Sequence, residues 1–205
     1  MAVDAVLFDV DGVLVDSGDV HGRVWRAWAR VRGLDPEYVF EVTQGRRRSD
    51  TLAVVAPGCD PGVENELLDA LMAEEEQGIT AFPDVARVLG GLRVPWAVVT
   101  SGRGEATRLR LRRLGLPVPE VRVCAEDVRR GKPAADGYLV AAARLGVRPE
   151  RCLVVEDSPA GVRAGSAAGC RVHAVTTTHS TSDLAAADAC FGALADAVHG
   201  LREES

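Results

Sequence analysis

Short runs of apolar and β-branched residues recur along the chain, and amphipathic stretches separate them. Such runs are typical of strands that are buried on both faces of a parallel sheet. The pattern predicts strands at about Ala5–Val10, Ala97–Thr100, Val121–Cys124, Cys152–Val155 and Val172–Val175.

Helical periodicity follows the later strands. The predicted helices are Glu105–Leu114, Asp136–Leu145 and Pro159–Ala168, and each is followed directly by a glycine, the residue favoured just after a helix C-terminus. Ser158 is a suitable N-cap for the last of them, with Pro159 in its first turn. Strands alternating with helices predict an α/β fold, a doubly wound parallel sheet with right-handed crossovers.

The pattern changes between residues 16 and 81, where helical stretches occur without clear strands. These stretches are His21–Arg32, Glu37–Thr43, Ser49–Val55 and Glu64–Gln77. We therefore expect an α/β core of residues 1–15 and 82–205 and an inserted α-helical unit of residues 16–81. Residues 201–205 are expected to form a frayed end.

Polar residues follow several of the predicted strands. Asp9 and Asp11 end the first apolar run, and side chains two apart on a strand share a face. Thr100 and the pair Glu156 and Asp157 fall at the carboxyl ends of other strands, where ligands bind in open α/β sheets. Lys132 follows the third strand, in a loop whose proline discourages a helix directly after it.

Composition and charge narrow the function classes. A chain of 205 residues can bury one core and carry a small appendage. The net charge of −6 disfavours nucleic acid as a partner. The start of the chain has no basic segment and its apolar run stops at Asp9, so neither a signal peptide nor a membrane span is expected. We expect a cytoplasmic location, and five cysteines without a CxxC pair argue against a disulfide framework or a zinc site.

Four segments in a fixed order carry a family resemblance. They are Ala5–Ser17, Trp96–Gly102, Gly131–Pro133 and Cys152–Gly161. Each is weak to moderately specific alone, but together they resemble the signature of the haloacid dehalogenase superfamily of phosphohydrolases, over essentially the whole chain. The resemblance implies that residues 16–81 form a helical cap that closes over the core.

The resemblance also implies a division of roles. Asp9 would attack phosphorus and form an aspartyl-phosphate, while Asp11 would protonate the leaving alcohol and then activate water. Lys132 would place a positive charge against phosphate and Asp9. The strand end at Thr100, Ser101 and Gly102 would bind the phosphoryl oxygens, since a hydroxyl and free backbone N–H groups there suit an anion.

A cluster of carboxylates requires a compensating cation. Oxygen-only ligands suit a hard ion, so we expect Mg²⁺. By the family pattern its ligands would be Asp9, the backbone carbonyl of Asp11 and Asp157, with Glu156 as a further ligand or a neighbour of one.

Substrate specificity is expected to lie in the cap. The segment 44–50 gathers three arginines beside a glycine and resembles the specificity loop of sugar-phosphate members of the superfamily, with Arg48 best aligned to their phosphate-contacting arginine. His21 is a further candidate, since His21 and Trp25 resemble a histidine and a tryptophan of the β-phosphoglucomutase branch. A solvated basic helix start and an incidental surface histidine are the plainer interpretations.

Three activities stay open on these grounds. The first is a Mg²⁺-dependent phosphatase, monomeric or weakly dimeric, acting on a small phosphorylated sugar, polyol or hydroxy acid. The second is a β-phosphoglucomutase, although residues 71–77 lack the cation that mutases carry in the fourth cap helix. The third is a non-catalytic phosphate sensor, which the intact set of catalytic residue types disfavours.

Overall fold

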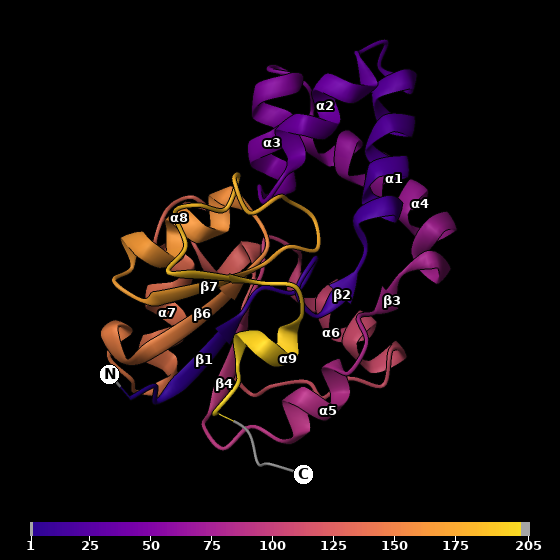
Figure 1. Ribbon diagram of the computed structural model, residues 1–205. Coiled ribbons are helices and arrows are strands. Elements are labelled where there is room, and N and C mark those ends of the chain that lie inside the picture. The colour runs from indigo at the N-terminus through magenta and orange to yellow at the C-terminus, as the bar shows by residue number, and fades with distance from the viewer. Residues whose placement is uncertain (1, 202–205) are drawn as a thin grey trace.

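A six-stranded parallel sheet forms the centre of the protein (Figure 1). The computed structural model describes residues 2–201. The strand order is β5 (Arg122–Val123), β4 (Trp96–Val99), β1 (Ala5–Phe8), β6 (Cys152–Glu156), β7 (Arg171–Val175) and β8 (Ala189–Phe191), and every neighbouring pair is parallel. The chain reverses its direction of winding after β5, since β6 returns to the other side of β1. The predicted fold class, a doubly wound α/β core, is confirmed.

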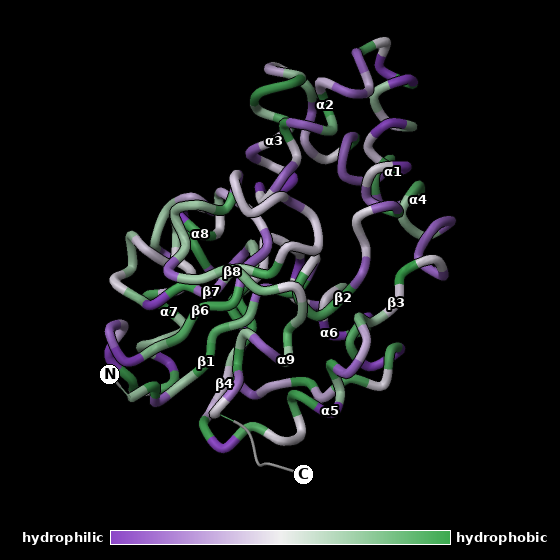
Figure 2. The backbone as a smooth tube through the Cα atoms, viewed as in Figure 1, coloured by the Kyte–Doolittle hydropathy of each residue, from purple (hydrophilic) through white to green (hydrophobic). Residues whose placement is uncertain are grey.

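Helices cover both faces of the sheet (Figure 1), so β1 is buried on both of its faces. Val6 and Phe8 belong to one apolar cluster, whereas Ala5 and Leu7 belong to the other. The first cluster packs against α5 (Val85–Gly90), α6 (Gly104–Arg113) and α9 (Leu194–Ala197), and the second against α7 (Asp136–Leu145) and α8 (Pro159–Ala167) (Figure 1). Figure 2 shows the resulting pattern, with strongly hydrophobic central strands and mixed outer segments.

Four helices form a separate group beside one end of the sheet (Figure 1). They are α1 (Gly18–Val31), α2 (Pro36–Thr43), α3 (Arg48–Val55) and α4 (Pro61–Glu75), followed by a 3-10 turn at Glu76–Gly78. Trp28 is fully buried among them, and its indole N–H donates to Glu64 over 2.8 Å. The chain enters this group through β2 (Val15–Asp16) and leaves it through β3 (Thr80–Ala81), which pair antiparallel. The two connections therefore run side by side, a geometry that suits the predicted inserted cap.

Several predicted helix ends match the structure. The glycines after α6, α7 and α8 have φ values of 68°, 70° and 81°, which is the left-handed conformation expected of a C-terminal cap. The side chain of Ser158 accepts a hydrogen bond from the Gly161 N–H over 3.1 Å, as expected of an N-cap.

Other elements differ from the sequence pattern. β8, α5 and α9 were not predicted, because each is short and carries little periodicity. The first strand ends at Phe8 rather than Val10, since the chain turns there and the Val10 carbonyl accepts from the N–H groups of Leu14 and Val15. Strand spacing therefore does not place Asp11; this turn does. The frayed end expected at 201–205 falls almost wholly outside the described residues.

No helix within residues 2–201 is both long enough and apolar enough to span a membrane.

Candidate active site

A cavity of about 250 Å³ lies between the sheet and the helical group. Its core side is formed where β1, β4 and β6 end, and its other side by α1, α4 and the segment between α2 and α3. Of the predicted site residues, those that line it are Asp9, Asp11, His21, Arg48, Thr100, Ser101, Gly102, Lys132 and Asp157. The structure thus brings residues from four distant segments and from both units to one space.

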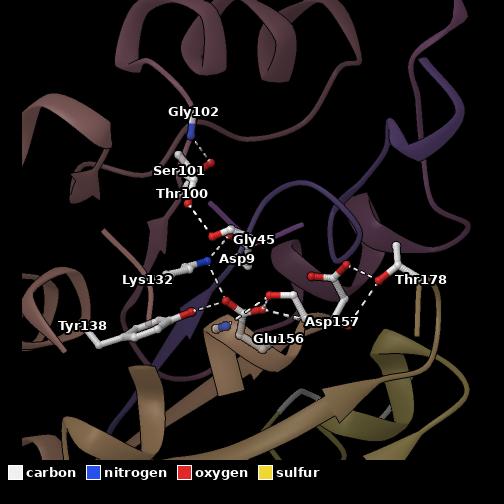
Figure 3. A network of polar contacts seen from close by, with 12 residues as sticks. Asp9, Gly45, Thr100, Ser101, Gly102, Lys132, Tyr138, Glu156, Asp157 and Thr178 are labelled. Carbon is white, nitrogen blue, oxygen red and sulfur yellow. Dashed lines mark hydrogen bonds and ion pairs between the residues drawn. The ribbon is translucent and has the colours of Figure 1, made fainter. Parts of the chain in front are cut away.

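Asp9 and Lys132 form the centre of the site (Figure 3). The Lys132 Nζ lies 2.5 Å from Asp9 Oδ1 and 2.5 Å from Glu156 Oε1, and all three side chains are buried. Burial and the Glu156 carboxylate raise the pKa of Asp9 to about 7, although the Lys132 ammonium opposes them. The lysine is fixed between two carboxylates, so its charge reaches the cavity in one defined position.

Both carboxylate oxygens of Glu156 are bound by groups inside the protein. Its Oε1 accepts from the Tyr138 hydroxyl over 2.7 Å as well as from Lys132, and its Oε2 accepts from the backbone N–H groups of Asp157 and Ser158. A Cβ on Gly161 would lie 1.7 Å from Glu156 Oε1, so the carboxylate fits only beneath a glycine of α8. Both oxygens of Glu156 are thereby engaged, and its relative exposure is 0%.

Asp157 is held from two sides but faces the cavity. Its Oδ2 accepts from the Thr178 hydroxyl over 2.5 Å (Figure 3). Gly12 has φ +86°, and a Cβ there would lie 2.0 Å from the same oxygen. Burial and the neighbouring carboxylates of Glu156 and Asp9 raise the pKa of Asp157 well above its ordinary value.

The carboxylates of Asp9, Glu156 and Asp157 form a compact acidic cluster. One oxygen from each lies within 4.8 Å of the others, and all three residues are buried. Lys132 is the one cation that contacts this cluster among the described residues, so three acids face a single positive charge. All-oxygen donors with an excess of negative charge fit a hard divalent cation.

The end of β4 carries the predicted phosphate-binding segment. The Thr100 hydroxyl accepts from the Gly102 N–H over 2.9 Å, which fixes the turn that leads towards α6. The Ser101 hydroxyl donates to the Gly45 carbonyl over 3.1 Å (Figure 3). Ser101 therefore links the end of β4 to the segment between α2 and α3 as well as lining the cavity.

Asp11 lies apart from the acidic cluster. Its Oδ1 accepts from the Ser17 hydroxyl over 2.6 Å and from Arg110 Nη1 over 3.3 Å. His21 Nε2 lies 3.9 Å from the same oxygen. Burial disfavours the charged form of Asp11, but the nearby positive charge and the Ser17 hydroxyl outweigh it and hold the pKa below its ordinary value.

An ion-pair network crosses the mouth of the cavity. Arg48 Nη1 lies 2.7 Å from Asp69 Oδ1 within the helical group, and Arg103 Nη1, just before α6, lies 2.9 Å from Asp69 Oδ2. A second connection is Arg47, which donates to the carbonyls of Val128 and Arg129 in the loop that leads to Lys132.

Sequence reasoning missed several members of the site. Thr178 follows β7, so the rule that ligands bind beyond strand carboxyl ends could have found it. Tyr138, Arg110 and Asp69 lie within helices, where nothing in the local pattern separates them from ordinary packing or surface residues.

The chain matches a family whose members would need a site of this kind. The model of the haloacid dehalogenase-like hydrolases matches residues 3–169. The chain belongs to this family. Haloacid dehalogenase-like hydrolases generally use a divalent metal, and the acidic cluster of this member could bind one.

Similar proteins of this family include named phosphatases. Hexitol phosphatase A of Escherichia coli (strain K12) is 44% identical over 190 residues, which cover 90% of this chain and 88% of the relative. Glycerol-1-phosphate phosphohydrolase 2 of Saccharomyces cerevisiae is 30% identical over 191 residues, covering 87% and 76%. A crystal structure of a haloacid dehalogenase family hydrolase from Deinococcus radiodurans R1, with bound phosphate and sodium, is 30% identical, covers 99% of each chain and has a TM-score of 0.70. The predicted enzyme class, phosphoric monoester hydrolase, is confirmed.

Proposed function

We propose that this hydrolase removes phosphate from a small phosphorylated sugar or polyol through a phosphoaspartyl intermediate. The observation that carries the proposal is Asp9, a buried carboxylate at the cavity floor that Lys132 holds over 2.5 Å. The names of the relatives, a hexitol phosphatase and a glycerol-1-phosphate phosphohydrolase, support the substrate class.

In the first step an Asp9 oxygen attacks phosphorus and the bond from phosphorus to the alcohol oxygen breaks. Lys132 and the turn at Thr100 and Ser101 offset the negative charge on the phosphoryl oxygens. Asp11 must carry a proton for this step, and the negative charge that the substrate phosphate brings beside it favours the protonated form. Asp11 then gives this proton to the departing alcohol, which is a poor leaving group as an alkoxide. The products of this step are the free alcohol and the Asp9 aspartyl-phosphate.

In the second step water hydrolyses the intermediate. Asp11, now a carboxylate, takes a proton from the water while its oxygen bonds to phosphorus and the bond to Asp9 breaks. Inorganic phosphate leaves, and both aspartates return to their starting states. The cap side of the cavity limits how much water reaches the intermediate.

Asp9 and Asp157, with the main-chain carbonyl of Asp11 by the family pattern, would hold Mg²⁺. The bound ion supplies positive charge against the phosphoryl oxygens and the carboxylates. The engaged oxygens of Glu156 suit a different role, which is to fix the Lys132 ammonium. We extend the proposal to a cytoplasmic enzyme that is monomeric or weakly dimeric, with residues 16–81 as its cap.

The experiment is phosphate release from a panel of hexitol, glycerol, sugar and hydroxy-acid phosphates, with Mg²⁺ and with a chelator. The expected result is Mg²⁺-dependent release from one compact group of polyol or sugar phosphates. Conversion of β-glucose 1-phosphate to its 6-phosphate isomer without phosphate release would instead identify a mutase. If no compound of the panel releases phosphate while the protein still binds inorganic phosphate, the protein would be identified as a sensor.

A further inference from the structure

Arg110 is a buried arginine that the proposed reaction does not use. It lies in the last turn of α6, and its side chain is 9% exposed. A guanidinium stays charged at any ordinary pH, so burying it is costly unless carboxylates compensate the charge. Its partners therefore indicate what it is for.

Two carboxylates from opposite sides of the cap boundary bind this guanidinium. Arg110 Nε and Nη2 lie 3.0 and 2.9 Å from the two oxygens of Glu76, a bidentate pair. The remaining nitrogen, Nη1, lies 3.3 Å from Asp11 Oδ1. Glu76 belongs to the turn after α4 through which the chain leaves the cap, so one side chain connects that joint to Asp11.

The contacts leave the two oxygens of Asp11 in different environments. Ser17, Arg110 and His21 all approach Oδ1. No hydrogen bond to Oδ2 occurs within residues 2–201, and Asp11 lines the cavity. Anchoring Oδ1 leaves Oδ2 as the oxygen that can exchange a proton with substrate or water.

We propose that Arg110 is a positioning residue that orients Asp11 for proton transfer and ties this orientation to the joint of the cap through Glu76. The proposal rests on the proposed function, in which Asp11 is the general acid. A purely structural Arg110 would join the core to the cap without affecting proton transfer. The two roles therefore predict different losses of rate for substrates with different leaving groups.

The test is the single-turnover rate of transfer to Asp9, measured with enzyme in excess over a hexitol phosphate or over p-nitrophenyl phosphate. An alkoxide must be protonated as it leaves, whereas nitrophenolate leaves readily as an anion. For Arg110→Gln we expect the rate with the hexitol phosphate to fall by at least about tenfold, which is part of the roughly 100-fold or more that general acids contribute. The rate with p-nitrophenyl phosphate should fall by less than about threefold.

Arg113→Gln is the matched control. Arg113 Nη2 donates to the carbonyls of Glu76 and Ile79 over 3.0 Å each, so it binds the same joint from the same helix, and it contacts Glu76 rather than Asp11. We expect less than about a threefold change on both substrates, as for most surface substitutions. If Arg110→Gln does not fold, Glu76→Gln with Arg110→Met removes the unpaired Glu76 charge and the same rates are measured.

The outcomes separate this inference from the proposed function. Equal loss on both substrates in Arg110→Gln, or the same loss in Arg113→Gln, would overturn the positioning role. The Asp11→Asn variant tests the acid itself, because it should show the leaving-group dependence whatever Arg110 does. An equal fold-loss on both substrates in Asp11→Asn, relative to the wild type, would overturn the assignment of Asp11, and with it this inference.

Discussion

The core and cap sides of the cavity are built in different ways. On the core side, Asp9, Lys132 and Glu156 are buried, and Lys132 binds both carboxylates. Glu156 also accepts hydrogen bonds from four further donors. On the cap side, Asp69 is half exposed and holds its two arginines through single contacts. Rigid, dry charges can stabilise a transition state, whereas solvated pairs can rearrange around different alcohols. We infer that chemistry is set by the core and substrate choice by the cap.

The strongest test of that division is Asp9→Asn. The amide cannot form the acyl phosphate, so we expect kcat to fall by roughly 10⁴-fold or more on every substrate, a scale seen when other covalent nucleophiles are removed. Phosphate release would be measured with a hexitol phosphate and with p-nitrophenyl phosphate. Sustained turnover of either would contradict a covalent role for the core.

The same division explains what could be predicted from the sequence. Asp9 and Asp157 each directly follow a strand, so the rule for parallel sheets located them. Lys132 lies in a loop beyond β5, and it was located by the order of the Gly131–Pro133 segment among the family motifs. Arg110 and Asp69 lie within helices and meet partners 99 and 34 residues away in sequence. Such pairs depend on how the cap docks, which no local pattern encodes. The short strand β8 could not be predicted for a related reason. It is a strand because it pairs with β7, and its own sequence pattern does not indicate one.

Lys132→Met tests the rigid side through both activity and stability. The substitution leaves Asp9 and Glu156 buried without their cation, which typically destabilises a protein by about 3–5 kcal/mol. We expect kcat to fall by about 10²–10³-fold, as when one contact to the transition state is removed. Kinetics and thermal unfolding would be compared with Arg130→Met, which removes an exposed cation from the same loop. Similar losses in both variants would mean that the buried position of Lys132 is unimportant.

Thr178→Val tests the proposed Mg²⁺ site on the core side. The Thr178 hydroxyl donates to Asp157 Oδ2, and removing groups that orient a metal ligand typically weakens metal affinity by about 10–100-fold. We expect the Mg²⁺ dissociation constant, measured by titration calorimetry, to rise by about tenfold, which is the lower end of that range. Thr178→Ser keeps the hydroxyl and should bind Mg²⁺ like the wild type. Normal Mg²⁺ binding by Thr178→Val would show that the Thr178 hydrogen bond does not position Asp157 for the metal.

Asp69→Asn should give the smallest effect, and its pattern is the most informative about the cap. Exposed ion pairs contribute at most about 1 kcal/mol each, so we expect KM for a hexitol phosphate to rise by roughly fivefold or less. The kcat for p-nitrophenyl phosphate should stay the same, because the core is untouched. Asp84→Asn, which loses an exposed pair with Arg87, is the control for general surface effects. A fall in kcat on both substrates would mean that the network at the cavity mouth also orders the catalytic groups, and the separation of chemistry from substrate choice would then fail at Asp69.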